Sequence, residues 1–335
     1  MQTSTKKTIF FLVVSIIAVI FTAILSIFLG STNISWQKVL MAFFLGDMTD
    51  HQQIAVLELR LPRTIGDILV GAGLAGAGAM MQGITRNPLA DSGILGINAG
   101  ASFGLAMCLA FLTNVSFGFT ILASFLGAAM AIFLVFGLLL LKRRKLDAAR
   151  LVLAGLAVSM FLTALTQGIS ILTNTGQTLT FWTAGGTAAI RMEQLKIAGP
   201  IMIIAILAGI LLSKKVSILS LGDEAAQGLG IDLFRSKMAC LLTVLLLSGT
   251  SVALAGPVGF VGLLVPHLVR PFVGSKYEAV IPCSMVLGSA LMLAADLIAR
   301  TISAPTETPI GLIFAIIGVP VFIAICRKEG ADQDA

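Results

Sequence analysis

The sequence predicts an all-α membrane protein with about ten transmembrane helices. Hydrophobic residues make up 57% of the 335 positions and charged residues only 11%, whereas soluble domains carry about 25% charged residues. The mean hydropathy is +1.02, and apolar runs long enough to cross a bilayer core of about 30 Å recur along the whole chain. We therefore expect a single transmembrane domain over residues 1–335 and exclude a soluble fold.

Ten apolar runs set the expected helices. The first follows Lys6 and Lys7 and is longer than the apolar core of a signal peptide, so we expect it to be retained as a helix. The eighth is short and interrupted by glycine and proline, which predicts a partial or re-entrant helix. A further short helix is expected around residues 179–182, between the fifth and sixth runs. The runs cover residues 8–30, 62–84, 94–113, 117–141, 149–172, 195–213, 236–255, 257–270, 279–299 and 309–326.

The second run, residues 62–84, is the one around which we expect the others to pack. It is dense in glycine and alanine, and its glycines include Gly71, Gly76 and Gly78. Lipid provides no hydrophobic force between helices, so a helix of this kind is held by close backbone approach over small residues. Pro62 suits the first turn of a helix, where its missing N–H does no harm.

The placement of lysine and arginine predicts the orientation. With the N-terminus in the cytoplasm, 16 of the 22 lysines and arginines fall on the cytoplasmic side, as the positive-inside rule requires. Both termini are then cytoplasmic. The six on the outer side are Lys38, Arg60, Arg63, Arg191, Lys196 and Arg300. Among these, Arg60, Arg63 and Arg300 stand out as arginines on the side where arginine is depleted.

Motifs for catalysis are missing from the sequence. It has no phosphate-binding loop, no HExxH zinc motif, no GxSxG nucleophile motif and no paired carboxylates within one span. The four cysteines lack CxxC spacing, and His51 and His267 stand alone, so we expect no bound metal or cofactor. The net charge of +6 is explained by the cytoplasmic lysines and arginines, so nucleic acid is not expected as a partner. We therefore expect this chain not to be an enzyme.

Two aspartates lie close in sequence to the outer arginines. Asp67 follows Arg63 by four residues, and Asp296 precedes Arg300 by four. Residues four apart share a helix face, so we expect Asp67 and Asp296 to be ion-pair partners of these arginines near the membrane boundary. Neutralisation of charge at a helix end is favoured over a catalytic role.

The loop of residues 220–231 is the most unusual cytoplasmic stretch. Asp223 and Glu224 suit the first turn of a short helix, and Gly228 or Gly230 would end one. We expect two short helices separated by glycine, which together form a knob that enters a groove on a partner. The alternative is a structured loop without a partner.

Six segments resemble, in order and spacing, the permease subunits of type II ABC importers for iron-siderophores, haem and vitamin B12. They are LRLPRTIGDILVGAGLAGAGAMMQGITRNPLADSGILGINAGASFG, LAGLAVSM, LGDEAAQGLGI, GPVGFVGLLVPHLVRPFVG, ADLIAR and PTETPIGLIFAIIGVPVFIAICRK. The resemblance covers residues 55–328 and implies the type II ABC importer permease fold.

This resemblance also implies the partners and the energy source. Permeases of this kind work as dimers, so a second permease subunit, identical or homologous, is expected. They bind two copies of a cytoplasmic ATPase, which holds ATP and Mg, and they receive cargo from an extracytoplasmic substrate-binding protein. The expected location is the bacterial cytoplasmic membrane, as a multi-pass protein in the lipid bilayer.

Residue roles follow from the resemblance by position. It implies that Arg60, Arg63 and Arg300 dock glutamates of the binding protein. The cytoplasmic gate corresponds to Asn87, Pro88, Leu89, Ala148 and Ala149. The contact with the ATPase corresponds to coupling helices within 218–231, at Leu221, Gly222, Asp223, Glu224, Ala225, Ala226, Gln227, Gly228, Leu229 and Gly230.

The sequence therefore predicts the permease subunit of an ATP-driven importer that works by alternating access. Its expected cargo is a bulky iron chelate, with a ferric siderophore first and haem and cobalamin as open alternatives. The walls of the pathway are expected to be apolar and rich in small residues. The competing class is a stand-alone secondary transporter or channel, which usually carries ionisable residues at mid-depth. Here the middles of the spans are nearly uncharged.

Overall fold

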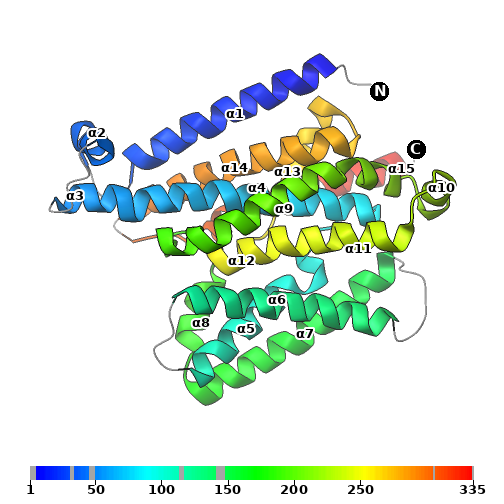
Figure 1. Cartoon of the computed structure of the whole chain (residues 1–335), viewed down its shortest axis with the longest axis horizontal. Coiled ribbons are helices and arrows are strands. Elements are labelled where there is room, and N and C mark those ends of the chain that lie inside the picture. The colour runs from blue at the N-terminus through cyan, green and yellow to red at the C-terminus, as the bar shows by residue number, and fades with distance from the viewer. Residues whose placement is uncertain are drawn as a thin grey trace.

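All regular secondary structure in the described part of the chain is helical, which confirms the predicted fold class. The computed structural model describes residues 5–30, 34–44, 50–112, 117–140, 148–304 and 306–333. Figure 1 shows long helices running side by side, with α4 inside the bundle and α1 along one edge. The α-helices are α1 Thr5–Phe28, α2 Trp36–Phe44, α3 His51–Ile54, α4 Leu61–Thr85, α5 Ile97–Phe111, α6 Phe117–Leu140, α7 Ala148–Thr173, α8 Gly176–Thr183, α9 Met192–Leu219, α10 Asp223–Gly228, α11 Leu233–Val244, α12 Thr250–Ala255, α13 Val261–Val273, α14 Tyr277–Ile302 and α15 Ile310–Gln333.

The expected spans are present. Seven helical runs are long and apolar enough to cross a membrane, and three shorter apolar helices accompany them in the described residues. One long run joins α11 and α12 through a π-helical turn at Leu245–Gly249. α13 has 13 residues, which is about 20 Å at 1.5 Å per residue, so it is a partial span as predicted. α8 is the short helix expected after the fifth span.

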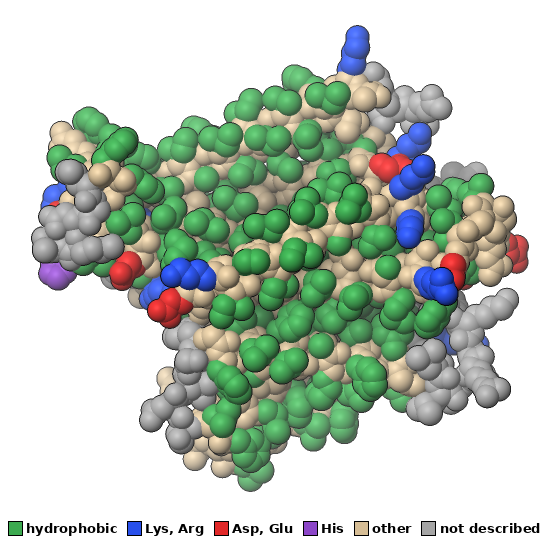
Figure 2. Space-filling model, in the orientation of Figure 1, with side chains coloured by type: hydrophobic (Ala, Val, Ile, Leu, Met, Phe, Trp, Pro, Cys, Tyr) green, Lys and Arg blue, Asp and Glu red, His purple; other side chains and the backbone are tan. Residues whose placement is uncertain are grey.

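Side-chain chemistry divides the molecule into a central apolar band and two charged ends. In Figure 2, hydrophobic side chains cover the middle of the bundle, while lysine, arginine and acidic side chains gather toward its ends. α10 lies at the same end as both chain termini, and α2, α3 and α8 lie at the other (Figure 1). This surface matches a bilayer, which requires an apolar band with charged margins.

Glycine lets α4 pack closely against its neighbours. In the span that contains α4, 83% of a membrane-length window is buried, the largest share among the candidate spans. A Cβ at Gly71 would overlap the backbone of Gly288 in α14, and a Cβ at Gly78 would overlap the backbone of Gly262 in α13. Side chains larger than hydrogen would therefore force these helices apart.

The start of α4 agrees with the prediction in part. Pro62 lies in the first turn of α4, as expected, but α4 continues from α3 through a π-helical turn at Ala55–Arg60. Proline has no N–H to donate and its ring crowds the carbonyl four residues earlier, so a proline inside a continuous helix needs a local change of hydrogen bonding. A π-helical turn provides that change.

α2 and α3 were not expected from the sequence. α2 packs through Val39 and Ala42 against Val56 at the outer end of the bundle. Asp50 caps α3 by accepting the Gln52 N–H at 2.9 Å and lies 3.0 Å from the Lys38 ammonium. The hydrogen bond from the Gln52 N–H lowers the pKa of Asp50 below its ordinary value, and the contact with Lys38 lowers it further. These local contacts fold the segment that joins α1 to α4.

A Gly78→Ala substitution is expected to destabilise the chain, because its methyl group meets the Gly262 backbone. Overpacking of this kind costs about 1–3 kcal/mol. The matched control is Gly137→Ala in α6, where the added methyl group meets nothing within 4 Å. Thermal denaturation of the purified chain in detergent measures both. Equal midpoints for the two variants would contradict the close-packing argument.

Candidate functional site

A cluster of charged residues fills the end of the bundle opposite α10, where α4 meets α14. Arg63 forms two hydrogen-bonded ion pairs: its Nη2 lies 2.7 Å from Asp296 Oδ1, and its Nη1 lies 2.7 Å from Glu307 Oε1. Arg300 Nε lies 3.4 Å from Asp296 Oδ2. Asp296 is completely buried, so this single carboxylate holds two guanidinium groups in a place that excludes water.

Two of the outer arginines also bind the end of α1. Arg60 Nη1 donates to the carbonyls of Ile27 and Phe28, both at 2.9 Å. Arg300 Nη2 donates to the Ser26 carbonyl at 2.8 Å and to its hydroxyl at 2.6 Å. The last carbonyls of a helix lack intrahelical partners and carry partial negative charge, so cations are favourable there. These arginines therefore fasten α1 to α4 and α14.

The predicted ion pairs form only in part. Asp296 pairs with Arg300 as expected, but Arg63 turns toward α14 instead of toward Asp67. Neither carboxylate oxygen of Asp67 has a hydrogen-bond partner among the described residues, although the side chain is completely buried. The nearby hydroxyl of Thr187 donates to Asp296 instead, at 3.3 Å. Arg60, Arg63 and Arg300 are 7%, 9% and 3% exposed, so within the single chain they are largely covered.

A short helix projects from the opposite end of the bundle. Residues 218–231 contain one short helix, α10, where two were expected, and Gly230 separates it from α11. Gly222 and Gly230 have φ angles of +112° and +78°, which only glycine adopts readily. Ala226 anchors α10 in the core, whereas Ala225 and Gln227 are exposed.

Residues around α10 add two features that the sequence did not reveal. Lys237 in α11 is buried, and its ammonium group donates to both carboxylate oxygens of Asp223, at 2.9 and 2.7 Å. Phe234 at the start of α11 is 54% exposed, and Leu221 and Leu229, which flank α10 in the sequence, are 65% and 62% exposed. A phenylalanine two residues after the helix-capping Asp232 was the signal available for this apolar patch.

The predicted gate residues Asn87, Pro88 and Leu89 lie on the turn that follows α4. Asn87 closes the turn, because its side-chain oxygen accepts the Leu89 N–H at 2.9 Å. Arg86 ends α4 in the left-handed conformation, with φ of +54°, and a Cβ added at Gly222 would lie 3.4 Å from its guanidinium. Ala148 and Ala149 begin α7, but their side chains lie outside the described residues.

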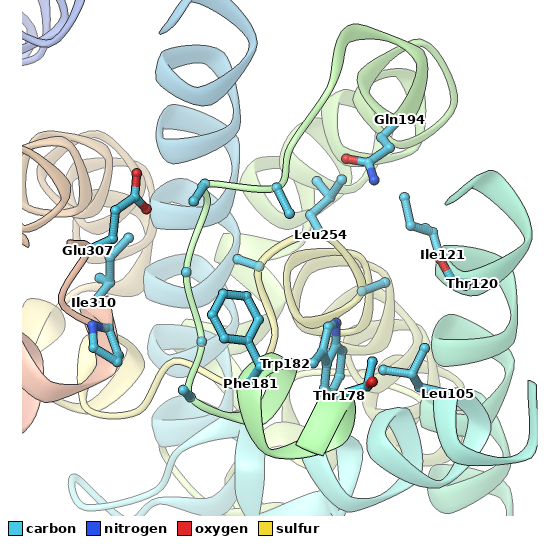
Figure 3. Close-up of a pocket in the computed structure, with 18 of the residues that line it drawn as sticks. Leu105, Thr120, Ile121, Thr178, Phe181, Trp182, Gln194, Leu254, Glu307 and Ile310 are labelled. Atoms are coloured by element: carbon cyan, nitrogen blue, oxygen red, sulfur yellow. The ribbon is translucent and has the colours of Figure 1, made fainter. Parts of the chain in front are cut away.

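Two cavities of similar size flank α8. One, of about 440 Å³, is lined mainly by apolar side chains and is bounded at one edge by Arg63 and Glu307. In Figure 3, Phe181 lies between Glu307 and Ile310 on one side and Trp182 with Leu105 on the other. The second cavity, of about 480 Å³, lies between α5, α7 and α8 and is lined largely by hydroxyl and amide side chains.

Comparison with known proteins identifies the fold. The model of the FecCD transport family matches residues 17–328. The chain belongs to this family. It is 40% identical over 310 residues to the iron(3+)-hydroxamate import system permease protein FhuB of Bacillus subtilis strain 168, which covers 92% of this chain and 80% of that protein. It is 38% identical to the iron-uptake system permease protein FeuB of the same organism, over 96% of this chain and 97% of that protein.

A solved structure confirms the type II ABC importer permease fold. A metal-chelate type ABC transporter in an inward-facing conformation matches with a TM-score of 0.83 and 29% identity, over 95% of this chain and 98% of that chain. The Fe(3+)-citrate import system permease protein YfmD of Bacillus subtilis strain 168 is 40% identical, over 94% of each chain. This member of the FecCD family is thus a multi-pass permease subunit of an ABC import system and not its ATPase.

The two buried aspartates of this FecCD permease are expected to differ in how much stability is lost when each is replaced by asparagine. Asp296→Asn leaves two buried arginines short of a counter-charge, and breaking a buried pair costs about 3–5 kcal/mol. Asp67→Asn removes a buried charge that has no hydrogen-bond partner in the described residues, so no loss of stability is expected. Thermal denaturation in detergent compares the two. A larger loss for Asp67→Asn would contradict this assignment.

Proposed function

We propose that this chain is the translocation subunit of an ATP-driven importer for ferric siderophores. It moves the chelate from an extracytoplasmic binding protein to the cytoplasm by alternating access. Support for the cargo comes from curated relatives that cover nearly the whole chain and are named for iron(3+)-hydroxamate, Fe(3+)-citrate and iron uptake. Haem and cobalamin remain the alternative cargoes, and uptake assays with labelled ferric chelates, haem and cobalamin distinguish them.

The observation that carries the ATP-driven mechanism is the apolar patch around α10. Leu221, Leu229 and Phe234 are more than half exposed at the end of the bundle that holds both termini. By the lysine and arginine distribution this end is cytoplasmic, so lipid does not cover the patch. Exposed apolar side chains outside the membrane favour contact with another protein, and two copies of an ATPase that binds ATP and Mg are the partners we propose.

A second permease subunit, identical or homologous, covers another apolar surface in this proposal. In α7, only 17% of the membrane-length window is buried, and Leu153, Met160 and Phe161 are all more than half exposed. α15 likewise exposes Ile316. In the bacterial cytoplasmic membrane, with both termini cytoplasmic, two such subunits would enclose a pathway between them.

Docking of the binding protein is proposed at the outer charged cluster. Glu307 is 40% exposed at its side chain, whereas Arg63 is 10% exposed, so Glu307 is the part of this pair that a partner reaches first. A glutamate of the binding protein would displace Glu307 and take its place on Arg63. Arg60 and Arg300 contribute mainly indirectly, because they hold the end of α1 and add positive potential near Arg63.

Removal of the internal carboxylate should strengthen docking. In Glu307→Gln the competitor of Arg63 is gone, and a partly exposed pair of about 1 kcal/mol corresponds to about fivefold tighter binding. Arg63→Gln should weaken binding, and the exposed Lys196→Gln should leave it unchanged. Binding of the labelled binding protein to the complex in nanodiscs measures all three. Unchanged affinity in both Glu307→Gln and Arg63→Gln would exclude docking at Arg63.

Truncation of the α10 patch should release the ATPase. Phe234→Ala and Leu229→Ala remove apolar anchors, and interface anchors are worth about 2 kcal/mol or more, so at least about tenfold weaker association is expected. The matched control is Leu211→Ala, since Leu211 is 80% exposed on the membrane-spanning α9. Co-purification with the ATPase measures the effect. Full co-purification of the Phe234→Ala and Leu229→Ala double variant would overturn the coupling role.

A further inference from the structure

Three helices turn polar side chains toward one cavity inside the membrane span. The cavity of about 480 Å³ is bounded by α5, α7 and α8. On α7 its lining includes Ser159, Thr163, Thr166 and Ser170, which are spaced by four, three and four residues and so share one helix face. This face extends over 11 residues, or about 16 Å. Nine of the 13 residues that line this cavity carry a hydroxyl or an amide group, among apolar atoms that make up the larger part of its surface.

The remaining surface of α7 is apolar. Leu153, Leu156, Met160 and Phe161 are exposed and lie off the polar face. Polar groups that face lipid are unfavourable, and polar residues inside a span usually line a water-filled route. α8 bounds this cavity on one side, and Gly93, six residues after the predicted gate turn at Asn87, also lines it.

Most of the hydroxyl groups that line this cavity donate their protons within their own helices. Ser102 donates to the carbonyl of Asn98, Thr166 to that of Leu162 and Thr180 to that of Gly176, at 2.8–3.0 Å. Ser159 and Ser170 likewise donate to carbonyls of their own helix. A hydroxyl has one proton and two lone pairs, so these five groups offer the cavity lone pairs, whereas the amides of Asn98 and Gln167 offer both donors and acceptors.

Charge is missing from the same surface. None of the described residues that line the cavity is a lysine, arginine, aspartate or glutamate. An anion that enters such a place loses water and gains no counter-charge, which is unfavourable. A polar ligand with no net charge replaces its water contacts with hydrogen bonds to the hydroxyl and amide groups of the lining.

We propose that this cavity is a transit site for the chelate and that it selects uncharged ferric chelates over anionic ones. Fe³⁺ bound by three hydroxamates is neutral, because each hydroxamate loses one proton, and a peptide-based trihydroxamate adds amide N–H donors. Ferric citrate is anionic and consists mainly of acceptor oxygens. This inference rests on the proposed transport of ferric chelates and narrows it to one chemical class.

Direct binding of chelates to the assembled permease–ATPase complex in nanodiscs tests the inference. The binding protein is left out, so that its selectivity does not affect the result. The probes are a neutral ⁵⁵Fe-labelled peptide trihydroxamate and ⁵⁵Fe-labelled citrate in equilibrium dialysis. The wild type is expected to bind the neutral chelate at least about tenfold more tightly, since the anion gains no compensating partner. Equal or tighter binding of ferric citrate would overturn the proposal.

Substitutions in the cavity sharpen the test. Thr166→Val keeps the side-chain shape and removes one acceptor, so binding of the neutral chelate is expected to weaken about threefold to tenfold. The matched control is Thr22→Val in α1, whose hydroxyl also donates to its own helix, at 2.8 Å to the Ala18 carbonyl. Gln167→Lys adds a cation and should narrow or reverse the preference for the neutral chelate, whereas Gln167→Glu should not. A preference that is unchanged in Gln167→Lys would place the chelate elsewhere and overturn the inference.

Uptake in cells separates this inference from the proposed function. If ferric citrate is transported and the neutral trihydroxamate is not, the ferric-chelate importer stands and only the selectivity of the cavity falls. If neither ferric chelate is transported while haem or cobalamin is, the proposed cargo falls and this inference falls with it.

Discussion

Close contact between backbones holds this membrane protein together, and the functional ends depend on it. Where α4 passes α14 and α13, glycine faces glycine, at Gly71 with Gly288 and at Gly78 with Gly262. In lipid the gain comes from van der Waals contact over small residues and not from a hydrophobic force. Because α4 is fixed along its length, its first turn presents Arg63 to α14, and its last turn leads into the turn at Asn87.

Arg60, Arg63 and Arg300 have a structural role that bears on the docking we propose for them. Arg300 shares Asp296 with Arg63 and also holds the last turn of α1. A reversal of all three charges would therefore damage the fold as well as the proposed docking. The pair of Arg63 with Glu307 is different, since it is the one with a partly exposed carboxylate. In the proposed docking, exchange of one carboxylate for another would leave the number of ion pairs unchanged and so would make docking reversible.

The sequence predicted features that depend on local composition and missed those that depend on distant partners. Span positions follow from long apolar runs, and the ends of α10 follow from Gly222 and Gly230, whose backbone conformation needs glycine. Arg63 pairs with Asp296, which is 233 positions away along the chain. The four-residue spacing of Arg63 and Asp67 therefore predicted the wrong partner. The polar face of α7 was visible as spaced serines and threonines, but only packing against α5 and α8 reveals that it borders a cavity.

The attachment of α1 also has a consequence for how the protein is made. α1 is synthesised first, yet the arginine that caps its last turn is 274 residues away along the chain. At about 5–20 residues per second, translation needs roughly 15–55 s to reach that arginine. During this time Arg300 is not yet there to bind the end of α1. Since α1 has little buried surface of its own, it stays at the edge of the growing bundle. Closure of this end of the bundle therefore waits until α14 has been synthesised.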